Sequence, residues 1–136
     1  MVFKKVLWLC LVTSLFLIIA CAPKKKETVL QHVLEDGAQV EKVEFKHGTV
    51  RKESTVKVLT ASVTIKNTSN AAKRYKCDIW IPGIGAGQDF APASHQKKIE
   101  PGQTDVSTIS IVTDETWIPE TGKYQLRIAV DPFSNK

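Results

Sequence analysis

Cysteine and histidine carry the most reactive side chains of this chain, and their spacing limits the chemistry that they support. The chain has three cysteines and three histidines. A blue-copper site needs two histidines, one cysteine and usually an axial methionine, and the nearest set is Cys77 with His47 and His95. His95 lies too far along the chain from Cys77 for the compact ligand loop of such a site, and the only methionine is Met1. Alternation along 74–82 instead puts Cys77 on the same face as Ile79 and Ile81, the face expected inside, so we predict a buried structural thiol, which behaves as a small apolar side chain.

Other patterns that carry chemistry are missing from the sequence. The segment Gly83–Gly87 reads G-x-G-x-G rather than a nucleotide-binding fingerprint, and Pro92 stands where that fingerprint needs a helix. The histidines have no metal-ligand spacing, and no loop carries the alternating acidic residues of a calcium site. No serine, histidine and acid form a nucleophilic arrangement. We therefore expect no catalytic residue, no metal and no cofactor.

The segment 1–22 has the three parts of a secretory signal, namely a positive start, an apolar middle and a small-residue end. Lys4 and Lys5 precede an uncharged run from position 6 to position 22, and positions 24–26 are all lysine. The length of this run is at the short limit for a membrane-spanning helix. Because lysines stand on both sides, there is no clear positive-inside bias. A cleaved signal is therefore favoured over an uncleaved membrane anchor.

The apolar run ends in Ile18-Ile19-Ala20-Cys21, two branched aliphatic residues, a small residue and a cysteine. This segment resembles the lipobox of bacterial lipoproteins. The resemblance implies cleavage before Cys21 and attachment of lipid to its thiol. Ordinary signal cleavage after Ala22 would instead place Pro23 first in the mature chain, and proline is a poor substrate there because it fixes φ and lacks an N–H. Two or three acyl chains, such as palmitate, give stable membrane attachment where one chain does not.

The sequence then divides into a signal peptide over residues 1–20, a lipidated tether over 21–37 and one domain over 38–136. The part that remains after cleavage, 21–136, is long enough for one core. Within the tether, residues 28–36 have the apolar spacing of a short helix that ends at Gly37, although a first strand or a plain linker is also open.

We expect the protein in the bacterial cell envelope. It would lie in the outer membrane of a diderm and otherwise on the outer face of the cytoplasmic membrane.

The positive charge of the chain belongs to its N-terminal end. Of 19 lysines and arginines, five precede Glu27, which leaves 14 against 14 acidic residues in the rest of the chain. A neutral domain lacks the basic surface of a nucleic-acid-binding protein. The expected partners are therefore the membrane, through Cys21, and a protein of the envelope.

From residue 38 onward the apolar residues recur with the period of two that is typical of strands. The clearest predicted strand spans 55–67, and segments 74–82, 105–113 and 124–130 alternate in the same way. His47-Gly48 predicts a turn, Gly83–Ser94 a loop and Gln96–Ile99 a short edge strand. Several strands without a long helical pattern predict an all-β fold, an antiparallel immunoglobulin-like β-sandwich of about seven strands.

Three segments carry a family resemblance: VTIKNTS at 63–69, IEPGQ at 99–103 and GKYQLRIAVD at 122–131. Together they resemble bacterial immunoglobulin-like domains of the CARDB type over residues 40–131. The resemblance implies an extracytoplasmic adhesion, spacer or partner-binding role without catalytic residues. The last two segments are also similar to a bacterial proteinase-inhibitor sandwich.

Large apolar residues outside the predicted core form a candidate binding surface, because exposed tryptophans are enriched at binding hot spots. Its members are Trp80, Ile84, Phe90, Trp117 and Ile118. The alternative is that the tryptophans cover the open ends of the sandwich.

We expect a lipid-anchored envelope protein whose domain binds or positions another envelope or cell-surface component without catalysis. One alternative is an inhibitor of an envelope protease, with a loop such as Gly83–Ser94 entering the active site. A second alternative is a small metal carrier or enzyme.

Overall fold

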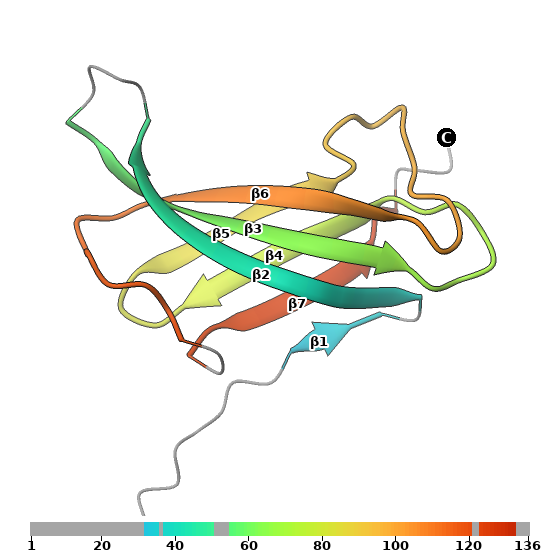
Figure 1. The fold of residues 1–136 in the computed structure, drawn as a ribbon, viewed down its shortest axis with the longest axis horizontal. Helices are drawn as coiled ribbons and strands as arrows, with labels where there is room; N and C mark the ends of the chain where they lie inside the picture. The colour runs from blue at the N-terminus through green and yellow to red at the C-terminus, as the bar shows by residue number, and fades with distance from the viewer. Residues whose placement is uncertain (1–31, 36, 51–54, 121–122, 133–136) are drawn as a thin grey trace, which may run out of the picture.

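A computed structural model describes residues 32–35, 37–50, 55–120 and 123–132 (Figure 1). Within these ranges there are seven strands and no helix, so none that could cross a membrane. The strands are β1 (Val33–Leu34), β2 (Ala38–Thr49), β3 (Lys57–Asn67), β4 (Tyr75–Ile81), β5 (Gly85–Ala91), β6 (Thr104–Val112) and β7 (Gln125–Val130). The predicted all-β sandwich of about seven strands is confirmed. The predicted signal peptide and Cys21 lie outside the described residues.

The strands form two sheets that lie one behind the other in Figure 1. The four-stranded sheet has the order β1-β7-β4-β5, and the three-stranded sheet has the order β2-β3-β6. All neighbours are antiparallel except β1, which runs parallel to β7. The chain crosses from the first sheet to the second at Gly37, whose φ is +86°. A helix ending at Gly37 was one of the expectations, and it is wrong for Val33–Leu34, because these residues pair with β7 instead.

The core lies between the sheets and follows the alternation of the sequence. The inward side chains of β3 are fully buried, and they are Leu59, Ala61, Val63 and Ile65. Opposite them the inward residues of β4 and β7 are buried as well, including Cys77, Ile79, Leu126 and Ile128. Burial of each large aliphatic side chain contributes about 1.5–3 kcal/mol relative to exposure. The described domain thus rests on a hydrophobic core, and Cys77 within it is free.

The predicted loop over Gly83–Ser94 is wrong for most of its length, because Gly85–Ala91 is strand β5. This strand pairs with β4 from Ile81↔Gly85 to Tyr75↔Ala91. A Cβ on Gly87 would lie 2.5 Å from Cγ2 of Ile109 on β6. The inner face of β5 therefore has no room for a side chain at Gly87, and the strand lacks the apolar alternation that would have revealed it.

Two smaller predictions also differ from the structure. The predicted turn at His47-Gly48 is wrong, since β2 continues to Thr49 in register with β3. Glycine loses no packing at position 48, because a Cβ there would have no atom within 4 Å to contact. In the predicted edge strand over Gln96–Ile99, only Ile99 pairs, through an isolated bridge with Lys73.

The edge of β7 that faces away from β4 is covered by β1 and by the two residues that flank it. His32 Nδ1 accepts the Leu126 N–H at 3.2 Å, and a Glu35 side-chain oxygen accepts the Val130 N–H at 2.8 Å. The two-residue strand β1 pairs between these positions. Edge strands with open N–H groups are templates for unwanted pairing. Here two side chains satisfy the donors that such a short strand cannot reach.

On the opposite side of the sandwich, an aspartate on edge strand β5 points inward and bonds to β6. Asp89 pairs in register with buried Cys77, so both side chains face the interior. Its Oδ2 accepts the Thr108 N–H of β6 at 3.1 Å. A charged residue that points inward on an edge strand is a known device against edge-to-edge association. Asp89 thereby joins the neighbouring edges of the two sheets.

Candidate functional site

The structure divides the five predicted surface residues between two regions. Trp80, 46% exposed, and half-buried Phe90 lie on the outer face of the four-stranded sheet. Trp117 and Ile118, 41% and 53% exposed, lie in the connection between β6 and β7. Ile84, in the turn between β4 and β5, packs against the core instead of facing solvent. The five residues therefore divide between the outer face of one sheet, the β6–β7 connection and the core.

Trp117 is held in place by its neighbours at one end of the sandwich. Its carbonyl oxygen accepts a hydrogen bond from His47 Nε2 at 3.1 Å, and its indole N–H donates to Glu115 at 3.1 Å. A Cβ on Gly83 would lie 3.8 Å from its ring, so the indole borders the turn between β4 and β5. Trp117 is thus bonded to β2 and lies beside the turn between β4 and β5, although 41% of it is exposed.

Phe90 is also engaged within the molecule. The guanidinium carbon of Arg74 lies 4.0 Å from the centroid of its ring, a cation–π contact. Phe90 and Trp80 face the same side of the sheet but stand four residue pairs apart in the β4–β5 register. Trp80 is therefore the member of the predicted set whose ring is both exposed and without a bonded neighbour among the described residues.

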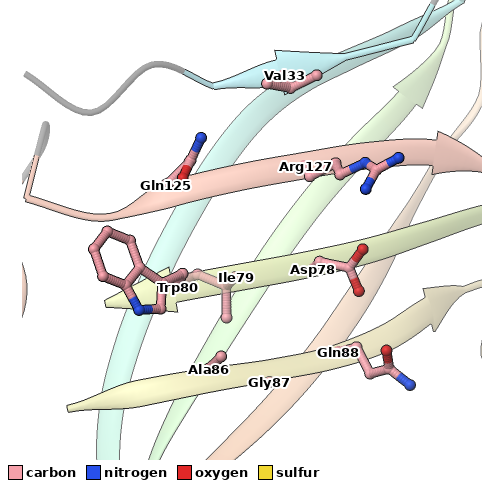
Figure 2. A pocket seen from close by; sticks show the side chains of 9 residues that line it. All are labelled: Val33, Asp78, Ile79, Trp80, Ala86, Gly87, Gln88, Gln125 and Arg127. Carbon is pink, nitrogen blue, oxygen red and sulfur yellow. The ribbon is translucent and has the colours of Figure 1, made fainter. Parts of the chain in front are cut away.

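A hollow of about 440 Å³ lies beside Trp80 on the outer face of the four-stranded sheet. Figure 2 shows its side chains, which come from β1, β7, β4 and β5. In the strand register, the neighbours of Trp80 are Ala86 on β5 and Gln125 on β7. Because the alanine side chain is a single methyl group, it cannot cover the flank of the indole. The hollow is thus a direct result of a small residue paired with a large one.

Polar side chains that have no partner surround this hollow. Gln88, Gln125 and Arg127 line it, and none of their side chains has a hydrogen bond or ion pair with another described residue. Asp78 also lines it and forms an ion pair with Lys76 at 3.1 Å. All of these groups stand on paired strands, so the backbone that carries them is fixed before any ligand arrives. Preformed polar groups around an apolar surface are typical of a small-ligand site.

A second hollow of about 420 Å³ lies at the end of the β2–β3 hairpin, between His47, Lys57 and Glu115. Two of its polar side chains are already used within the protein. His47 binds the carbonyl of Trp117, and Glu115 accepts the indole N–H of the same residue. This hollow therefore offers fewer free groups to a ligand than the one beside Trp80.

Cys77 is a buried free thiol, as its place in the alternation predicted. Burial raises the pKa of Cys77 to about 12, and the carboxylates of Asp78 and Asp89 act in the same direction. The buried Ser107 hydroxyl opposes this pKa shift, but its geometry falls short of a hydrogen bond to any described group. The described residues include no group of three His, Cys, Asp or Glu side chains that would hold a metal ion.

The raised thiol pKa predicts that Cys77 resists alkylation in the folded protein. At pH 8 a pKa of about 12 leaves about one thiol in ten thousand as the reactive thiolate. We expect iodoacetamide to leave the Cys77 peptide unmodified in native protein and to label it fully in denaturant, as read by mass spectrometry. A Thr108→Cys variant is the control, because this exposed position on β6 should react in the native state. Equal labelling of both positions would contradict the burial of Cys77.

The residues around Trp80 were not predicted as a group. Alternation along one strand places Asp78 and Trp80 on the same face, and alternation along another does so for Gln125 and Arg127. Only the register between β4 and β7 shows that the two pairs lie side by side. Nothing in a single sequence specifies that register.

Neither protein-family models nor curated proteins nor solved structures gave a match to this chain.

Proposed function

We propose that this protein is a lipid-anchored component of a bacterial envelope whose sandwich domain binds or positions another envelope component without catalysis. The hollow beside Trp80 is the observation that carries the binding role. It combines an exposed indole with three polar side chains that have no partner within the described residues. Large aromatic and arginine side chains of this kind supply most of the binding energy in protein recognition sites.

The anchoring part of the proposal is supported by the sequence Ile18-Ile19-Ala20-Cys21 behind an apolar run. Acyl chains on Cys21 would hold the domain at the membrane surface, since each buried methylene contributes about 0.8 kcal/mol. His32, the first described residue, stands eleven positions after Cys21. At about 3.3–3.6 Å per extended residue, this segment limits the domain to roughly 40 Å from the anchored sulfur.

The protease-inhibitor alternative offered Gly83–Ser94 as an example of a loop that enters the active site. Residues 85–91 of that segment are paired along their whole length with β4, so the segment has no extended loop to enter an active site. The partner-binding proposal is therefore preferred.

The proposal predicts different losses for two single variants. Wild-type protein should be recovered from membranes with the mass of residues 21–136 plus acyl chains, cross-linked to a stoichiometric component. Cys21→Ser should leave the membrane fraction, because it has no thiol to carry lipid. Trp80→Ala should stay at the membrane but bind the component at least about thirtyfold more weakly, which is the usual loss at a hot spot.

Trp117→Phe is the matched control, because it alters the tryptophan that already has partners within the protein. This variant should stay in the membrane fraction and retain the component. Unlipidated wild-type protein would refute the anchor. Full retention of the component by Trp80→Ala would refute the role of the hollow.

A further inference from the structure

The chemical character of the hollow beside Trp80 indicates the class of ligand that it accepts. We propose that it binds a neutral glycan, with one pyranose ring stacked on the indole of Trp80. This inference rests on the proposed function and specifies the component that the domain recognises. Three properties of the hollow carry it: the open indole, the free polar groups and the balance of charge.

The indole of Trp80 offers the flat apolar surface that a sugar ring needs. Pyranose rings present a face of C–H groups, and tryptophan provides a large and rigid ring to cover it. Trp80 is 46% exposed, and its neighbour Ala86 is too small to fill the adjoining space, as Figure 2 shows. Beyond Trp80, the other large apolar side chain exposed at the hollow is that of Val33.

The polar side chains match the hydroxyl groups of a sugar. Each of Gln88 and Gln125 carries an amide with one acceptor oxygen and two donor hydrogens, and Arg127 adds a fork of donors. A hydroxyl group both donates and accepts, so it can bond with either half of an amide. Because these side chains have no hydrogen bond or ion pair with other described residues, a ligand need not displace an internal partner.

The charge of the site favours an uncharged ligand. Its charged lining groups are one carboxylate, Asp78, and one guanidinium, Arg127. A charged ligand of either sign would meet only one lining group of opposite charge, and Asp78 is in addition already paired with Lys76 at 3.1 Å, so the hollow offers no cluster of like charges to bind an ion. A hollow of about 440 Å³ falls within the range of about 300–1,000 Å³ that small-ligand sites occupy. By contrast, a stable protein–protein interface buries about 800 Å² of surface on each partner around a more apolar centre.

The test is calorimetric titration of the protein, extracted from membranes in detergent, with three neutral hexasaccharides. The probes are built from glucose, from mannose and from N-acetylglucosamine. We expect saturable binding of at least one probe. Trp80→Ala should weaken that binding about tenfold or more, and Gln125→Ala should weaken it severalfold. Trp117→Phe should bind as the wild type does, and thermal melts should show that all variants remain folded.

The inference is overturned if none of the three probes binds, or if Trp80→Ala binds as well as the wild type. Loss of a cross-linked protein partner in Trp80→Ala, without binding of any probe, would overturn the glycan but support the proposed function. Probe binding by a protein that is not lipidated would have the opposite meaning. It would support the glycan site and refute the anchor.

Discussion

Replacing Arg74 with methionine should lower the free energy of unfolding by about 3–5 kcal/mol, the usual cost of breaking a buried ion pair by removing one of its members. Arg74 Nη1 lies 2.6 Å from Asp131 Oδ2, and the two side chains are 6% and 3% exposed. The guanidinium also donates to the carbonyls of Pro92 and Ala93, at 2.9 and 3.0 Å. One side chain thus joins the start of β4, the end of β7 and the segment after β5.

Equilibrium urea unfolding of Arg74→Met measures this loss. The double variant Arg74→Met/Asp131→Leu should recover part of it, because it also removes the buried carboxylate that loses its ion pair with Arg74. Lys76→Met is the control, since it breaks the partly exposed pair with Asp78 on the same strand. That pair should contribute at most about 1 kcal/mol. Equal losses for Arg74→Met and Lys76→Met would show that burial of the first pair has no energetic weight.

Gly37→Ala should be destabilising for two reasons that a second glycine allows us to separate. A left-handed backbone costs a residue with a side chain about 1–2 kcal/mol, and Gly37 has a φ of +86°. Its Cβ would also lie 2.6 Å from Cβ of Ser69, and overpacking of this kind costs about 1–3 kcal/mol more. The Gly37 carbonyl accepts hydrogen bonds from the Thr68 N–H and the Tyr75 hydroxyl, so any shift would weaken both.

Gly102→Ala supplies the comparison. Gly102 has a similar φ of +78°, but nothing lies within 4 Å of the position of its Cβ. Urea unfolding should therefore show a loss of about 1–2 kcal/mol for Gly102→Ala and roughly twice that for Gly37→Ala. If the two variants lose the same free energy, the contact with Ser69 carries no cost and only the backbone conformation matters.

The inward and outward directions of side chains were predictable because a strand alternates locally. The alternation placed Cys77 inside and Trp80 outside, and both placements are confirmed. The turn predicted at His47-Gly48 and the loop predicted at Gly83–Ser94 were wrong because both predictions relied on glycine. Glycine marks turns by default, but here Gly48 lies in an edge strand and Gly87 lies under Ile109, where the packing requires a residue without a side chain.

Local sequence pattern was sufficient to establish the class of fold, the strands with apolar alternation and the burial of Cys77. These features depend on residues that are near one another along the chain, because the pleat of a strand repeats every two residues. Contacts between distant parts of the chain were needed to show that β5 is a strand, that Arg74 meets Asp131, and that Ala86 and Gln125 flank Trp80. Register between strands and packing between sheets join residues that are far apart in the sequence. The candidate site depends on these long-range arrangements, so the sequence identified its tryptophan but not its neighbours.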